Sequence, residues 1–129
     1  MTGEKPFTWH DFLELAEKIS EISIDNIEEA RARTIISRAY YACFHKALNF
    51  LKEKRNFKED TNGHIHKQVL DALRFYIPEL ADKFNDLLDD RVKADYTFEE
   101  RIKIKKAKEV VLRSKEVYRI IREMYKSSP

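Results

Sequence analysis

The sequence contains little of what makes tight turns or crosslinks: its 129 residues include two glycines, three prolines and one cysteine. So few glycines and prolines favour long helices joined by few loops. Because Cys43 is the single cysteine, an intramolecular disulfide is excluded and nothing points to an oxidising compartment. The chain also lacks a signal-peptide pattern and an apolar run of ~18 residues, so we expect a cytoplasmic protein without a membrane partner.

An excess of one charge sign is also missing, because 25 basic residues stand against 23 acidic residues and leave a formal net charge of +2. Such a balance gives no general attraction to nucleic acid, so RNA binding would require a local patch. A hydrophobic content of 43% and an aromatic content of 12% argue against disorder. The length fits a single domain over residues 1–129, with a core from about residue 8 to about residue 125.

Apolar residues recur at helical spacing along the chain, and no stretch shows the alternation of a strand. The pattern predicts five helices, at about residues 9–20, 25–54, 64–76 and 78–93, and from about residue 97 onward. Their predicted start signals are Thr8 for the first helix, Ser23 or Asp25 for the second, Pro78 for the fourth, and Thr97-Phe98-Glu99-Glu100 for the last. The sequence therefore predicts an all-α, five-helix up-and-down bundle.

Each predicted helix has one apolar face that should be buried. The residues of these faces are, in chain order, Trp9, Phe12, Leu15, Ala16 and Ile19; Ala32, Ile36, Ala39, Tyr40, Cys43, Ala47, Phe50 and Leu51; Val69, Leu70, Leu73, Tyr76 and Ile77; Leu80, Phe84, Leu87 and Leu88; and Ile104, Ala107, Val110, Val111, Ser114, Val117, Tyr118 and Ile121. The aspartates of the fourth helix, Asp82, Asp86, Asp89 and Asp90, are predicted to face solvent. The position of Cys43 favours a buried small hydrophobe over a nucleophile.

Three polar residues of the second helix and one histidine of the third do not fit a simple solvated face. Arg38, Tyr41 and His45 follow one another at i, i+3 and i+7, so they share a stripe on the flank of the long helix. On the third helix, His66 is directed to the buried side and His64 away from it. A single histidine on an apolar stripe is usually a core residue, but the neighbouring Arg and Tyr side chains make a functional role harder to dismiss.

Arg91 is the most unusual residue of the fourth helix. It follows Leu87 at i+4 and Leu88 at i+3, so it is directed with the leucines and not outward with the aspartates. An unpaired buried charge is strongly unfavourable. As a purely structural residue, Arg91 would bridge to a carboxylate such as Asp95 or Glu79 or extend to solvent at the end of the bundle. As a functional residue, it would open into a cleft that receives a ligand.

The sequence offers no ready metal or cofactor site. There is no H-x-x-x-H pair and no second cysteine, and His64 and His66 lie on different sides of a helix. Nucleophile triads, glycine-rich phosphate loops and dinucleotide fingerprints are also missing. We therefore expect neither a metal nor a cofactor.

Three short segments, taken in order, resemble the HEPN superfamily and in particular its small stand-alone prokaryotic members. They are Ser37-Arg38-Ala39-Tyr40-Tyr41-Ala42-Cys43-Phe44-His45, His66-Lys67-Gln68-Val69 and Arg91-Val92-Lys93-Ala94-Asp95-Tyr96. They match an S-x-R-x-Y-Y-x-x-F-H-like central helix, a later H-x-x-V and a closing R-x-x-A-D-Y. Each motif is weak alone, but their shared order and spacing make the resemblance fairly specific.

The resemblance implies a helical bundle that forms a homodimer, and a partner that is a minimal nucleotidyltransferase within a toxin–antitoxin pair. Active HEPN members are metal-independent ribonucleases with an R-x(4–6)-H motif, whose arginine corresponds to Arg91. The positions where the histidine would stand are Tyr96, Thr97 and Phe98, so that histidine is missing.

The function expected from this resemblance is binding of nucleotide, RNA or the partner protein through a polar cleft, with a degenerate ribonuclease motif. The candidate catalytic residues are Arg91 and His66, and the candidate binding residues are Arg38, Tyr41, His45, Asp95 and Tyr96. Two alternatives stay open. In one, the chain is a ribonuclease toxin in which His66 replaces the missing histidine. In the other, it is a purely structural bundle.

Overall fold

The computed structural model describes residues 5–61 and 63–129, and every regular element within them is a helix. The helices are α1 (His10–Glu21), α2 (Glu28–Lys54), α3 (Ile65–Tyr76), α4 (Pro78–Tyr96) and α5 (Ile104–Ser127). The predicted all-α, five-helix bundle is therefore confirmed.

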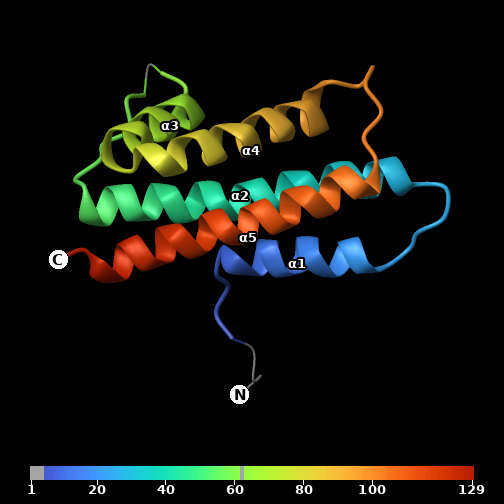
Figure 1. Cartoon of the computed structure of the whole chain (residues 1–129), viewed down its shortest axis with the longest axis horizontal. Helices are drawn as coiled ribbons and strands as arrows, with labels where there is room; N and C mark the ends of the chain where they lie inside the picture. The colour runs from blue at the N-terminus through green and yellow to red at the C-terminus, as the bar shows by residue number, and fades with distance from the viewer. Residues whose placement is uncertain (1–4, 62) are drawn as a thin grey trace.

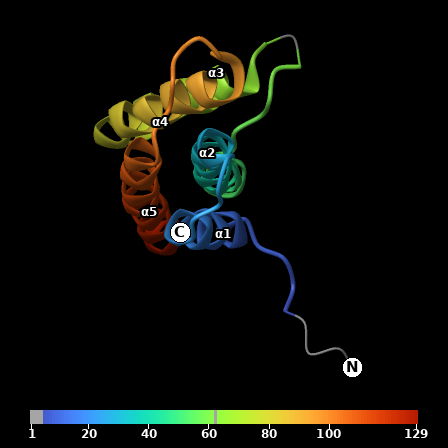
Figure 2. The same ribbon diagram turned by 90° about the vertical axis from the view of Figure 1, so that its right-hand side faces the viewer.

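α2 is the central helix, since it contacts each of the other four. Seen along the bundle in Figure 2, α1, α5 and the pair formed by α3 and α4 lie around it. The helices α1, α2, α4 and α5 alternate in direction, as the colour gradient of Figure 1 shows. Side chains on the flanks of α2 can therefore meet residues from several other helices.

The core is built from the apolar faces that helical spacing predicts. Its largest fully buried side chains include Tyr40, Phe50 and Phe84. Cys43 is also buried, and burial raises the pKa of its thiol to about 12. Such a thiol carries almost no thiolate at neutral pH, so Cys43 behaves as the small apolar residue that its position predicts.

The apolar face of α1 is rotated relative to the prediction. Leu15 is 45% exposed, whereas Leu13, Ala16 and Ser20 are buried. These three residues follow one another at i, i+3 and i+7 and lie on the side of α1 that packs against α2 and α5. The prediction for Leu15 is wrong because the apolar stripe of this short helix could be drawn through either leucine.

Two predictions at α3 and α4 are also wrong. Tyr76 is 41% exposed, because it is the last residue of α3 at the corner where the chain turns into α4. Asp90 is buried at 8% exposure, although it belongs to a run of otherwise solvated aspartates. Its carboxylate faces α5, where Lys106 Nζ lies at 3.4 Å and Arg113 Nη1 at 3.5 Å. Two cations from a neighbouring helix thus offset the cost of burying it.

The corner between α3 and α4 follows from proline chemistry. Pro78 occupies the first turn of α4, as predicted, where its missing N–H costs no hydrogen bond. Ile77, which precedes it, leaves the helical region with φ −141° and ψ 71°, because the proline ring disfavours helical geometry in the preceding residue.

The predicted starts of α1 and α2 need correction. α1 begins at His10 with Trp9 as its N-cap, so the side chain of Thr8 does not cap it. α2 begins at Glu28, with Ile27 as its N-cap, so neither Ser23 nor Asp25 starts it. The preceding residue, Asn26, has a left-handed backbone with φ 70°, and this turn separates Asp25 from the helix.

The end of α4 and the start of α5 also differ from the prediction. α4 continues through Tyr96, and α5 begins only at Ile104, with Lys103 as its N-cap. The segment 97–100 therefore belongs to the connection and does not start α5.

Arg33 of α2 explains this longer connection. Its guanidinium donates hydrogen bonds to the carbonyl oxygens of Lys93 at 2.9 Å, Ala94 at 3.0 Å and Glu100 at 2.7 Å. The first two carbonyls belong to the last turn of α4, where that of Lys93 also accepts from the backbone N–H of Thr97 at 3.1 Å, and the third belongs to the connection. One arginine thus holds both segments against α2.

Candidate functional site

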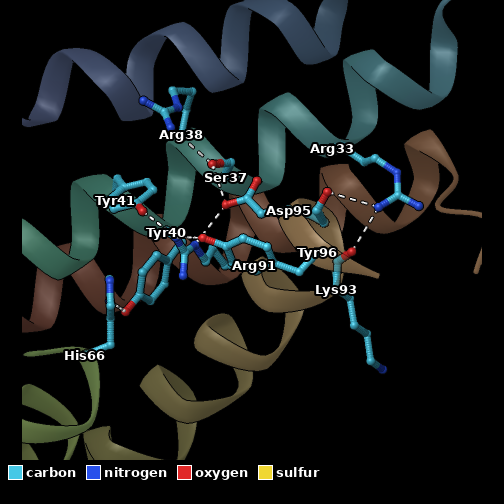
Figure 3. A network of polar contacts seen from close by, with 11 residues as sticks. Arg33, Ser37, Arg38, Tyr40, Tyr41, His66, Arg91, Lys93, Asp95 and Tyr96 are labelled. Carbon is cyan, nitrogen blue, oxygen red and sulfur yellow. Dashed lines mark hydrogen bonds and ion pairs between the residues drawn. The ribbon is translucent and has the colours of Figure 1, made fainter. Parts of the chain in front are cut away.

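Arg91 is directed from α4 toward α2 and is 8% exposed (Figure 3). Its Nε donates to Asp95 Oδ2 at 2.9 Å, and its Nη2 donates to the hydroxyls of Tyr41 at 2.5 Å and Tyr96 at 3.4 Å. Its guanidinium carbon also lies 5.1 Å from the ring centroid of Tyr41 and 5.2 Å from that of Tyr96. The inward direction predicted for Arg91 is confirmed, and Asp95 is its carboxylate partner.

The surroundings of Arg91 keep it charged and leave part of it unused. Burial opposes the charged form, but Tyr41, Asp95 and Tyr96 outweigh burial and raise the pKa of the guanidinium. Among the described residues, Nη1 has no hydrogen-bond partner. Nη1 is also not one of the fully enclosed polar atoms that lack a partner. Arg91 is therefore a fixed cation with N–H groups available to a ligand.

Arg38 approaches the same region from the flank of α2. Its guanidinium carbon lies between two aromatic rings, 5.2 Å from the centroid of Phe12 on α1 and 5.0 Å from that of Tyr41. Its Nη2 donates to Ser37 Oγ at 3.1 Å. Within the described ranges Arg38 makes no ion pair with a carboxylate. Cation–π contacts hold its position without neutralising its charge.

His66 of α3 is paired with Tyr40 of α2. Their Nδ1 and hydroxyl oxygen lie 2.7 Å apart. Burial raises the pKa of Tyr40 above its usual range. The hydroxyl therefore keeps its proton, and it shares a hydrogen bond with Nδ1 of His66 whose direction depends on the imidazole tautomer. Burial, followed by the charges of Arg91 and His45, lowers the pKa of His66, so the neutral form dominates at neutral pH.

His45 lies at the other end of the stripe on α2. Its ring stacks on Trp9 at the start of α1, with centroids 3.6 Å apart and an angle of 12° between the planes. The ring of Tyr41 also stacks with the imidazole of His45, with the ring centroids 6.2 Å apart. Burial lowers the pKa of His45, so this imidazole is also mainly neutral at neutral pH.

Asp95 and Tyr96 complete the arrangement from the end of α4. Asp95 Oδ2 accepts hydrogen bonds from Arg91 and from Ser37 Oγ, the latter at 3.2 Å. Tyr96 is 64% exposed, so its ring forms the solvent side of the guanidinium of Arg91. A ligand that approached Arg91 would therefore meet a phenol first.

The structure brings the seven residues chosen from the sequence into one connected network, although their roles stay predictions. We call this network the Arg38–Arg91 cluster; it comprises Arg38, Tyr41, His45, His66, Arg91, Asp95 and Tyr96. Two guanidinium groups and one carboxylate lie in it, so it carries a positive formal charge while both histidines are neutral. His64, which was predicted to point away, is exposed.

Sequence reasoning missed the contribution of α1 and of Ser37. Trp9 and Phe12 were assigned to an apolar face, but they stack on His45 and support Arg38. Their pairing joins two helices, and no local spacing reveals it. Ser37 stands beside Arg38 in the sequence and was part of the motif, but its link to Asp95 depends on the packing of α4.

Within the described residues, no group of three His, Cys, Asp or Glu side chains lies close enough together to hold a metal ion. The same part of the chain includes no helix that is long and apolar enough to span a membrane.

The chain is 33% identical over 117 residues to the protein named "Uncharacterized protein MJ0628" of Methanocaldococcus jannaschii. The alignment covers 78% of this chain and 70% of that protein. No family model and no solved structure matches the chain. The similarity defines a family but carries no activity with it.

Proposed function

We propose that this chain, which belongs to the family of the Methanocaldococcus jannaschii protein MJ0628, binds phosphate groups of RNA or of a nucleotide through the Arg38–Arg91 cluster. The observation that carries the proposal is a pair of arginines whose charge exceeds that of their carboxylate partner. Among the described residues, Arg38 makes no ion pair and Nη1 of Arg91 has no hydrogen-bond partner. Guanidinium groups fixed by aromatic rings suit recognition of a phosphate.

We further propose that the chain is the nucleotidyltransferase-partner component of a toxin–antitoxin-like module, as the resemblance to HEPN proteins implies. The geometry of the cluster supports a binding role over a catalytic one. Where the R-x(4–6)-H motif requires a histidine, the chain has Tyr96, Thr97 and Phe98. His66 is near, but its Nδ1 is occupied by the hydroxyl of Tyr40. This bond engages one of the two ring nitrogens of His66 and leaves only Nε2 for proton transfer.

Assembly as a homodimer is part of the proposal. Val92 is 41% exposed and Tyr96 is 64% exposed, and they lie four residues apart on α4 beside Arg91. A second copy that covered these side chains would bring its own arginines near the Arg38–Arg91 cluster. Light scattering of the purified protein at high micromolar concentration should give twice the chain mass, and a monomer there would contradict this part.

The binding proposal is tested with a fluorescent single-stranded RNA of about ten nucleotides in a buffer that contains EDTA. We expect salt-dependent binding that weakens at least about tenfold, or ~1.4 kcal/mol, in Arg91→Gln and in Arg38→Gln. Arg122→Gln is the matched control, since Arg122 is an exposed arginine on α5 outside the cluster. Equal losses in all three variants would reduce the effect to general charge and contradict the proposal.

The same samples separate the ribonuclease alternative from the proposal. We expect the RNA to remain intact in EDTA. Robust cleavage that disappears in both Arg91→Ala and His66→Ala would instead establish a ribonuclease with a replaced histidine. The purely structural alternative would be supported if Arg91→Ala failed to fold, as judged by circular dichroism.

A further inference from the structure

A pocket of about 370 Å³ lies between the end of α4, the connection that follows it, the start of α5 and Ile36 of α2. Its volume is in the range of small-molecule sites, roughly 300–1,000 Å³. The seven residues of the Arg38–Arg91 cluster do not line it. This pocket and the cluster are therefore separate features of the fold.

The pocket is lined by an excess of cations. Lys93, Arg101, Lys103 and Lys106 contribute positive charge, and Asp90 and Glu100 contribute negative charge, which leaves a formal charge of +2. Lys106 is paired with Asp90 at 3.4 Å.

The other three cations, Lys93, Arg101 and Lys103, make no ion pair within the part of the chain that the structure describes. All three are exposed. Arg101 is near enough to Glu29 to help lower the pKa of that carboxyl, but no carboxylate is paired directly with any of the three among the described residues.

The start of α5 adds to this positive potential. Lys103 is its N-cap without a side-chain hydrogen bond, and its first turn contains no acidic residue. The first N–H groups of a helix carry a partial positive charge that an anion stabilises. Lys103 and Lys106 at this end raise the potential further, so the pocket favours an anionic ligand on two independent grounds.

The other surface of the pocket is apolar. Ile36 is 1% exposed and Ile102 is half-buried, and both line the pocket. A purely inorganic anion would gain nothing from these side chains. A molecule with an anionic end and an apolar body would use both surfaces of the pocket.

We propose that this pocket binds a small phosphate monoester, with its phosphate among Arg101, Lys103 and Lys106 and its organic part against Ile36 and Ile102. A phosphate monoester carries about −1.5 to −2 charges at neutral pH. This charge matches the excess of +2 in the pocket. The proposal does not depend on the function proposed for the Arg38–Arg91 cluster.

Calorimetric titration of the full chain with AMP tests the proposal, because AMP joins a phosphate monoester to a flat organic body. The Arg38–Arg91 cluster is itself proposed to bind nucleotide phosphates, so the titration is carried out on Arg91→Gln, where we expect saturable binding of one AMP per chain in the pocket. Adenosine, which lacks the phosphate, and inorganic phosphate, which lacks the organic part, should each bind at least about tenfold more weakly. Binding of inorganic phosphate as tight as that of AMP would overturn the assignment of the apolar surface, and equal binding of adenosine would overturn the whole proposal.

Variants of single residues show where on the protein AMP binds. Lys103→Ala should weaken the binding of AMP about tenfold. Lys105→Ala is the control and should change the affinity for AMP less than twofold, because Lys105 lies in the same turn of α5 but does not line the pocket. AMP that binds in the pocket should still bind in Arg91→Gln, although this variant is expected to weaken phosphate binding at the Arg38–Arg91 cluster. Loss of AMP binding in Arg91→Gln with retention in Lys103→Ala would place the ligand in the cluster and contradict the proposal. If Lys103→Ala fails to fold, the shift in melting temperature that AMP causes in Arg101→Ala answers the same question.

Discussion

Asp90 and Arg91 are neighbours on α4 with the same 8% exposure, but they belong to different surroundings. Arg91 is directed toward α2, where it makes a hydrogen-bonded ion pair with Asp95 at 2.9 Å. Asp90 is directed toward α5, where Lys106 and Arg113 approach only to 3.4 and 3.5 Å. The short ion pair of Arg91 and the aromatic rings beside it fix the position of the guanidinium, whereas the longer contacts of Asp90 to two flexible side chains allow those side chains to move. α4 thus carries a rigid charge on one side and an adaptable charge on the other.

The largest expected effect comes from breaking the rigid side. Arg91→Met keeps the apolar first part of the side chain but removes the guanidinium, so Asp95 and Tyr41 lose their donor. Hydrogen bonds to charged groups are worth about 1.5–3 kcal/mol. Asp95 is 26% exposed at its side chain, so water recovers part of that loss. We expect the free energy of unfolding to fall by about 1.5 kcal/mol, measured by urea denaturation, with unchanged helical content before unfolding.

A double-mutant cycle checks the origin of that loss. Asp95→Asn alone should also destabilise the fold, and Arg91→Met should cost less in the Asp95→Asn background, because the pair is already broken. Strictly additive effects would mean that Arg91 acts through packing and not through Asp95.

The adaptable side should respond less. Asp90→Asn keeps the size of the side chain and removes its charge, so Lys106 and Arg113 lose a partner with which they make only long contacts. We expect the free energy of unfolding to change by less than about 1 kcal/mol, because the side chains of Lys106 and Arg113 are 39% and 45% exposed and water can replace the carboxylate around them. The same change removes a negative charge from the pocket beside α5, so AMP should bind more tightly. A large destabilisation, or weaker binding of AMP, would show that Asp90 organises its surroundings as Arg91 does.

The contrast between these neighbours also shows what sequence reasoning can reach. The direction of Arg91 followed from its spacing to Leu87 and Leu88, and helical spacing is a local property. The burial of Asp90 could not be predicted in the same way. It depends on cations from α5, 16 and 23 residues later in the chain, and the surrounding aspartates favoured a solvated face.

The ends of helices were harder to predict than their buried faces, again because the residues that determine them lie far away in the sequence. Arg33 holds the carbonyl oxygens of Lys93 and Glu100 from a position more than 55 residues earlier. Only the packing of α4 on α2 brings them together, so the extension of α4 through Tyr96 left no local signal. The stacking of Trp9 on His45 was missed for the same reason.

A third expectation concerns stability at mildly acidic pH. Burial lowers the pKa values of His45 and His66 in the folded chain. The unfolded chain therefore binds protons first as the pH falls below the ordinary histidine value of about 6.5. Folding stability is then lost progressively from about pH 6.5 downward until the folded-state histidines are also protonated. The urea concentration at the midpoint of unfolding should be lower at pH 5.5 than at pH 7.5. A variant with both histidines changed to glutamine should show a smaller difference between the two pH values.

The smallest expected effect uses His66 as a reporter of the two sides of α4. Burial is the main cause of its lowered pKa, and the positive charge of Arg91 is the second. Arg91→Met should therefore raise the pKa of His66, but leave it below the ordinary histidine value because burial remains. Asp90→Asn is the matched control, since it changes one charge on the neighbouring residue of α4 but on the side that faces α5. An NMR titration of the imidazole protons measures both variants. Equal shifts of opposite sign would mean that the two charges act on His66 alike, and the distinction between a rigid side facing the cluster and an adaptable side facing α5 would fail.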